Sequence, residues 1–175
     1  MRVLKVLGVV VVLIIFAIGI VFVMGARLPV NHVATSSIIV NAPQAAVWQM
    51  IEDIDKQPAW RTGLVGVEAM PSQNGHRCWT EVQKHMRMPL CEDASTPPAG
   101  RVVRIADPSL PFGGTWTYDL VELDIVGSPT KMTKLQITEN GTTGPALYRF
   151  IGHYIIGEDA MIKEYESDVQ KAAKH

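Results

Sequence analysis

Apolar residues follow one another without interruption from Val6 to Met24, a stretch with no charge, no proline and no amide side chain. At a rise of about 1.5 Å per residue, it would form a helix roughly 28 Å long, close to the hydrocarbon thickness of a bilayer. A helix buried in a soluble core would show polar residues along one rim, and this stretch has none. We therefore predict a membrane anchor over residues 1–27 and one further domain over residues 28–175.

A cleavable signal peptide is the alternative for the same stretch. The basic start fits, but the apolar region of a signal peptide usually spans only about 7–15 residues. The Val-Met-Gly triplet at 23–25 is a passable small-residue cleavage site, although it is not a strong Ala-x-Ala site. Arg2 and Lys5 precede the stretch and Arg27 follows it. Because basic residues favour the cytoplasmic side, we expect a single-pass protein of the cell membrane, with a cytoplasmic N-terminus and an extracytoplasmic domain.

Short β-rich segments separated by turn residues fill most of the remaining chain. The first, at 33–41, precedes Pro43, which is well placed to open a helix, and a second short helix is expected at 53–60. An Asn-Gly pair at 74–75 predicts a hairpin. The later strands are expected at 64–70, 77–84, 89–94, 101–106, 115–123 and 131–139. Such regularly spaced short strands are typical of a curved antiparallel sheet or a barrel.

The C-terminal segment has a helical pattern instead. From Ala146 to Ala173 there is no proline, and apolar residues recur at spacings of three and four. Gly152 and Gly157 interrupt this long amphipathic helix, and a glycine in a helix interior costs about 1 kcal/mol relative to alanine. We expect a bend at these glycines, or a close approach of another group to the backbone.

Charge and cysteine content narrow the classes of partner. The formal net charge is −1, and no Lys/Arg-rich block with interleaved aromatics occurs, so nucleic acid is not an expected partner. With a turn at 87–89, Cys91 would lie opposite residues 83–84, several positions along the ladder from Cys78. That register predicts no disulfide, and buried apolar packing is expected for both cysteines.

The order of these elements carries a family resemblance. The segment Ala-Pro-Gln-Ala-Ala-Val-Trp at 42–48, Trp60, Gly-Gly-Thr-Trp-Thr-Tyr at 113–118 and Thr-Glu-Asn-Gly at 138–141 occur in sequence. Together they resemble the START-like, or polyketide cyclase/dehydrase, superfamily (SRPBCC). The resemblance implies an α+β helix-grip fold, in which a seven-stranded antiparallel sheet curls around a long C-terminal helix and leaves an apolar cavity. It also implies a choice of functions, because members bind lipids, sterols, polyketides or hormones, and some catalyse cyclisation or hydrolysis.

Large side chains on the expected strands and C-terminal helix are the candidates for lining such a cavity. A curved sheet covered by one helix is difficult to fill completely, which favours an apolar pocket. Ordinary core packing is the alternative for each single residue. The candidates for ligand binding are Trp60, Trp79, Trp116, Tyr118, Phe150, Tyr154 and Met161.

Candidate catalytic groups are few. Glu81 shares a strand face with Trp79, Glu92 lies on the next strand, and His153 lies on the C-terminal helix. Alternation along a strand does not tell which face is concave, so the side on which the two carboxylates point stays open. No histidine has a partner at a zinc-type spacing, and no nucleophile elbow or phosphate loop is present. We therefore expect no metal and no cofactor.

Three functions are compatible with these patterns. The first is a membrane-tethered binding protein that holds a hydrophobic small molecule or lipid in an internal cavity. The second is a cyclase, dehydratase or hydrolase acting on a polyketide-like or aromatic substrate, which requires convergent polar groups deep in the pocket. The third is an interaction scaffold with a filled core and an exposed apolar patch. Binding is the preferred interpretation, because nothing in the sequence points to catalysis.

Overall fold

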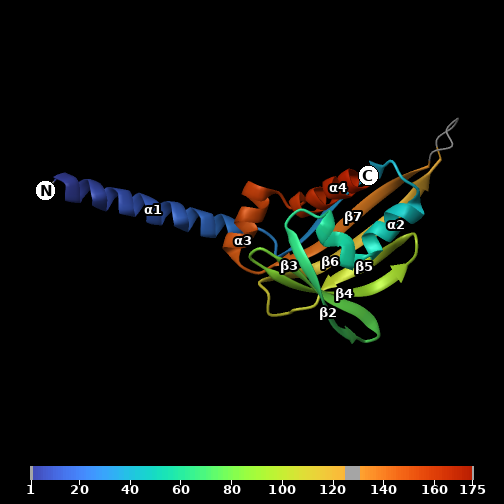
Figure 1. Cartoon of the computed structure of the whole chain (residues 1–175). Helices are drawn as coiled ribbons and strands as arrows, with labels where there is room; N and C mark the ends of the chain where they lie inside the picture. Colours follow the sequence, from blue (N-terminus) through green and yellow to red (C-terminus); the bar gives the residue numbers. More distant parts are fainter. Residues whose placement is uncertain (1, 125–130, 175) are drawn as a thin grey trace.

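The computed structural model describes residues 2–124 and 131–174. A long N-terminal helix projects from an α+β domain in which helices lie over one face of a sheet (Figure 1). In chain order the elements are α1 Arg2–Arg27, β1 Asn31–Val40, α2 Gln44–Glu52, the 3-10 helix η1 Ile54–Ala59, β2 Leu64–Gln73, β3 His76–Gln83, β4 Arg87–Thr96, β5 Gly100–Ile105, β6 Phe112–Leu123, β7 Met132–Thr143, α3 Ala146–Ile151, the π-helix η2 Gly152–Ile156 and α4 Ala160–Ala172. Every strand predicted from the alternation is present.

The strands form one antiparallel sheet in the order β1-β7-β6-β5-β4-β3-β2. β1 pairs with β7, so the first and last strands of the chain are neighbours. The hairpin predicted at the Asn-Gly pair is confirmed between β2 and β3, with Asn74 at φ 52° and Gly75 at φ 81°. The seven-stranded antiparallel sheet expected of a helix-grip fold is therefore present within the described residues.

The two faces of the sheet differ because successive strand residues point to opposite sides. On β7, Leu135 and Ile137 are buried, whereas Gln136 between them is partly exposed. These two side chains pack with Ile51 of α2 and with Ile162 and Val169 of α4 into the main core cluster. We call this the helix-covered face and its opposite the outer face.

The C-terminal segment is not one continuous long helix. Its last part, α4, has 13 residues, and it is separated from α3 and η2 by Gly157. Gly157 has a φ of 95°, a conformation that side-chain-bearing residues rarely adopt. The bend expected from the two glycines is thus present at Gly157, whereas Gly152 keeps a helical backbone and opens the π-helical turn.

Helix α1 contains a stretch, Lys5–Arg27, that is long and apolar enough to cross a membrane. Its large apolar side chains are exposed, from Val6 at 63% to Val23 at 54%. Only the C-terminal end of α1 meets the domain, where it packs on α3 (Figure 1). A methyl group on Gly25 would approach the Ala146 carbonyl oxygen to 2.0 Å, and the Gly25 carbonyl accepts a hydrogen bond from Arg149 Nε at 2.9 Å.

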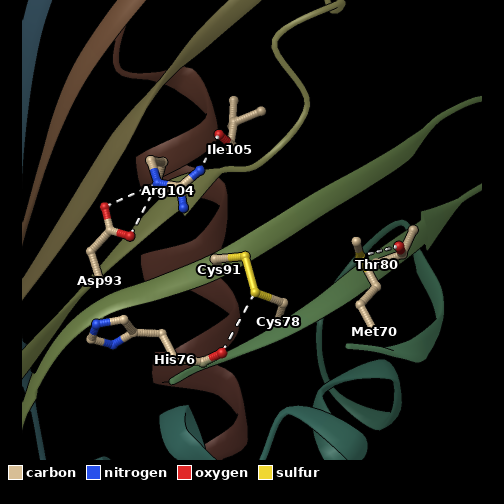
Figure 2. Close-up of a disulfide and its surroundings, with 8 residues drawn as sticks. All are labelled: Met70, His76, Cys78, Thr80, Cys91, Asp93, Arg104 and Ile105. Carbon is tan, nitrogen blue, oxygen red and sulfur yellow. Dashed lines mark hydrogen bonds and ion pairs between the residues drawn. A yellow bond between two sulfur atoms is a disulfide. The ribbon is translucent and has the colours of Figure 1, made fainter. Parts of the chain in front are cut away.

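The prediction that Cys78 and Cys91 are not bonded is wrong. The two residues form a disulfide, with their Cα atoms 4.1 Å apart, on adjacent strands β3 and β4 (Figure 2). The connection between these strands lies at 84–86 instead of 87–89, so Val82 pairs with Arg87 and the two cysteines face each other directly. A shift of about three residues in the turn accounts for the error.

Candidate functional site

Two cavities lie beneath the helices on the helix-covered face. The inner cavity, about 50 Å³, is enclosed by β3 to β7 and by α4. The outer pocket, about 480 Å³, lies at the end of the sheet near α1, between the strands and the α3–η2 segment. Met88, Trp116 and Met161 line both spaces and so form the wall between them. Pockets for small organic ligands usually measure about 300–1,000 Å³, so of these two spaces the outer pocket is the one large enough for the body of such a ligand.

A buried ion pair forms one side of the inner cavity. Arg61 Nη1 and Nη2 donate to Glu81 Oε1 and Oε2 at 2.5 and 3.1 Å, and the two side chains are 17% and 5% exposed. Burial alone would lower the pKa of Arg61, but the Glu81 carboxylate raises it above its ordinary value. Arg61 is therefore charged at any physiological pH, and its two hydrogen bonds occupy both Glu81 oxygens.

Arg101 brings a second guanidinium to the inner cavity. Its Cζ lies 5.7 Å from the ring centre of Trp79 and 5.3 Å from that of Tyr118, a cation–π arrangement. Its Nη1 is 3.9 Å from Glu92 Oε2, which is too far for a hydrogen bond. Tyr118 and Tyr165 pack edge to face beside it, and burial raises the pKa of both phenols. Both phenols therefore keep their protons at neutral pH.

The outer pocket is mostly apolar, and the polar side chains of its lining include two histidine–carboxylate pairs. Trp116 Nε1 donates to Glu139 Oε2 at 3.0 Å, and His32 Nε2 lies 3.5 Å from Glu139 Oε1. The side chains of His32 and Glu139 are only 18% and 14% exposed. His153 and Glu158, 2.9 Å apart, lie at the more exposed rim, with side chains 45% and 38% exposed. The pocket thus combines an apolar body with a polar cluster on one side.

Four of the seven residues predicted to line a cavity are brought together. Trp79, Trp116, Tyr118 and Met161 line the inner cavity, and two of these also line the outer pocket. The other three lie elsewhere. Trp60 borders an open groove beside α2 and packs edge to face on Tyr165, 5.7 Å between ring centres. Phe150 and Tyr154 stack against each other at 5.1 Å, and Phe150 also lies against Gly25 of α1.

The candidate catalytic residues occupy three different positions. Glu81 points toward the inner cavity, which settles the face that alternation left open, and it is bound to Arg61. Glu92 lies beside Arg101 and lines neither cavity. His153 lines the rim of the outer pocket. Among residues 2–124 and 131–174, no three His, Cys, Asp or Glu side chains are grouped as metal ligands would be.

Several residues of these cavities were missed in the sequence. Arg101 lies on the same face of β5 as Val103 and Ile105, and Glu139 lies on the same face of β7 as Leu135 and Ile137. A charged residue at an otherwise apolar alternation position is a signal for a buried polar group, and it could have identified both. Arg61 follows η1 in an irregular segment, where no periodicity exists to predict its direction.

The sequence matches no protein-family model. It matches no curated protein either. Solved structures are similar to it in fold. The Zhui aromatase/cyclase from a Streptomyces strain is 13% identical, with 82% of this chain and 94% of that chain covered and a TM-score of 0.64. A START superfamily protein from Mycobacterium smegmatis is 14% identical, with 81% and 99% covered and a TM-score of 0.58. Truncated norcoclaurine synthase from Thalictrum flavum is 10% identical, with 82% and 93% covered and a TM-score of 0.62.

These structural neighbours belong to the START and polyketide aromatase/cyclase superfamily. At 10–14% identity the likeness establishes the α+β fold alone. It agrees with the resemblance carried by the sequence motifs. Function has to be argued from the cavities of this chain.

Proposed function

We propose that the protein is a membrane-tethered binding protein that holds a hydrophobic small molecule or lipid. The observation that carries this proposal is the outer pocket, about 480 Å³ in volume and lined mainly by apolar side chains. A space of this size and character suits the body of an apolar ligand. Residues 1–27 serve as the anchor and residues 28–175 as the binding domain.

The position of the outer pocket supports the membrane tether. Leu28 and Pro29, which directly follow α1, are part of its lining. Beside it, η2 exposes Tyr154, Ile155 and Ile156 at 51%, 68% and 63%. Apolar side chains grouped at the base of an apolar helix are suited to the boundary of a bilayer. A ligand dissolved in the bilayer would then have a short path into the pocket.

The disulfide supports the orientation predicted from the basic residues. Disulfides persist in oxidising compartments and are rare in the cytosol. The Cys78–Cys91 bond therefore favours an extracytoplasmic domain with a cytoplasmic N-terminus. Protease digestion of intact cells, compared with permeabilised cells, tests this placement. Digestion of the domain in intact cells is expected, and full protection would contradict the orientation.

A pocket-filling variant tests the binding function directly. A Cβ on Gly152 would meet no atom within 4 Å, and this residue lines the outer pocket with an ordinary helical φ of −59°. Gly152→Leu is therefore expected to fold normally and to weaken binding of an apolar fluorescent probe about tenfold, in nanodiscs containing the full chain. Gly66→Leu is the matched control, because Gly66 also faces open space but lies outside both cavities. Equal probe binding by both variants would contradict the proposal.

An enzyme is the second candidate, favoured by one observation. His32, Glu139 and Trp116 place a histidine beside a carboxylate on the wall of the outer pocket, an arrangement suited to a general base. A cyclase, dehydratase or hydrolase acting on a polyketide-like or aromatic substrate would need such a group. Under this alternative, His32→Gln abolishes product formation, followed by mass spectrometry, while probe binding is retained. Absence of product from the wild-type protein would exclude the substrates tried.

A further inference from the structure

Unpartnered polar atoms are concentrated around the inner cavity. Within the described part of the chain, four buried side-chain nitrogen or oxygen atoms have no hydrogen-bond partner. Three of them, Trp79 Nε1, Arg101 Nε and Tyr165 Oη, belong to residues that line this cavity. The three residues are 2%, 5% and 8% exposed. Buried polar groups are almost always paired, so three unpaired ones around one small space indicate a place for a polar ligand atom.

The chemistry of these atoms selects the kind of ligand atom. An indole N–H and a guanidinium N–H can only donate hydrogen bonds, and a phenol can donate as well as accept. The complementary group is therefore a hydrogen-bond acceptor. A carboxylate suits this donor set, because a guanidinium forms its strongest hydrogen bonds with charged acceptors. Glu81 occupies Arg61 with two hydrogen bonds, whereas Glu92 forms an ion pair with Arg101 at 3.9 Å without a hydrogen bond and leaves Arg101 Nε unpartnered.

The size of the cavity limits what can enter. About 50 Å³ accommodates a water molecule or the few atoms of a carboxylate head group, but not a whole organic ligand. The outer pocket lies directly behind the shared wall of Met88, Trp116 and Met161. Two of these three residues are methionines, whose unbranched side chains readily change conformation. A rearrangement of this wall would join the two spaces into one channel with an apolar outer part and a donor-lined inner end.

We propose that the protein selects a single-chain amphiphile with a carboxylate terminus, whose apolar chain fills the outer pocket and whose carboxylate occupies the inner cavity. This inference rests on the proposed binding function and adds the class of ligand. Arg101 Nε, Trp79 Nε1 and Tyr165 Oη donate to the carboxylate. The paired Arg61 and Glu81 also line the cavity, and Arg61 Cζ lies 5.0 Å from the ring centre of Tyr165.

The test compares ligands that differ only in the head group. Dodecanoate, dodecanol and methyl dodecanoate are equilibrated by dialysis with the full chain in nanodiscs near neutral pH, and bound ligand is measured against empty nanodiscs. The wild-type protein is expected to bind dodecanoate about tenfold more tightly than dodecanol, as a charge-assisted hydrogen bond provides. Arg101→Gln should abolish this preference, measured as the ratio of the dodecanoate affinity to the dodecanol affinity of the same variant.

Arg104→Gln is the matched control. Arg104 lies on the same strand as Arg101 but on the outer face, where its Nε donates to Asp93 at 3.1 Å, so its loss should leave the preference intact. Tyr165→Phe removes one oxygen atom and should reduce the preference in part, even where Arg101→Gln does not fold. Equal binding of all three probes by the wild-type protein would overturn the carboxylate site but keep the proposed function. Failure of every probe to bind would overturn both.

Discussion

The two faces of the sheet carry charge pairs of very different character. On the helix-covered face, the Arg61 and Glu81 side chains are 17% and 5% exposed. On the outer face, the Arg87 and Glu68 side chains are 58% and 55% exposed. Both pairs are hydrogen-bonded, but water screens the outer pair and can solvate either partner if the other is lost. Burial, more than the presence of a partner, therefore decides how strongly the fold depends on a pair.

The largest loss of folding stability is expected when the buried Arg61–Glu81 pair is broken. Glu81→Gln leaves the Arg61 guanidinium charged and without a counter-ion, and removing one partner of a buried pair typically destabilises by about 3–5 kcal/mol. Glu68→Gln, the control on the outer face, should leave the unfolding midpoint within error of the wild type. Urea unfolding of the full chain in detergent micelles measures both. Similar midpoints for the two variants would remove the distinction between the faces.

The disulfide on the outer face provides the second comparison. Cys78 and Cys91 are 13 residues apart, and closing a loop of this length stabilises a fold by about 2–3 kcal/mol. Reduction with dithiothreitol should lower stability by that amount and leave ligand binding unchanged, because neither cysteine lines a cavity. The double variant Cys78→Ala/Cys91→Ala should not respond to the reductant. A loss of binding on reduction would show that the outer face shapes the cavities.

The smallest expected effect on stability concerns two carboxylates of α4 whose pKa values shift in opposite directions. Glu166 and Asp168 of α4 are each 2% exposed, and burial raises the pKa of Glu166. Burial acts on Asp168 in the same direction, but hydrogen bonds from Thr62 N at 2.6 Å and Oγ1 at 3.0 Å, with Lys171, lower its pKa below the ordinary value. Partners on a neighbouring segment thus reverse the effect of burial within two residues.

Opposite pH dependence is the expected result for these two carboxylates. Asp168 stabilises the fold above its ordinary pKa of 3.8 and loses this contribution as pH falls through its lower native pKa. Asp168→Asn should therefore destabilise by about 1 kcal/mol at neutral pH and progressively less in acid. Ionised Glu166 disfavours the fold at neutral pH. The stability of Glu166→Gln relative to the wild type should therefore be highest at neutral pH and should decrease as pH falls. Parallel pH profiles in urea unfolding would contradict this assignment.

The fold was more predictable than the site, for a physical reason. Strand alternation and the Asn74-Gly75 turn are local signals, and they gave the strands and the β2–β3 hairpin correctly. The disulfide depended on the position of one turn, and a three-residue error there was enough to separate Cys78 from Cys91. Local patterns fix elements better than they fix register.

The site depends on contacts between distant segments. Glu81 and Arg61, which bind each other, are 20 residues apart in the sequence, and Tyr165 of the last helix lines the same cavity. Period-two alternation could place Glu81 and Trp79 on one face, but not say that this face lies under α4. The predicted cavity residues on strands were brought together. Phe150 instead lies against Gly25 of α1 and Tyr154 packs on Phe150, because the bend at Gly157 separates α3 and η2 from α4.

The joint between α1 and the domain has a mechanical consequence. Only Leu28, Pro29 and Val30 connect α1 to β1, and Gly25 also contacts Ala146 and Arg149 of α3. Two separate attachments at one helix end restrict the rotation of the helix relative to the domain. Any rotation of α1 about its own axis would therefore turn the domain with it. The direction in which the outer pocket opens is therefore determined by the orientation of α1.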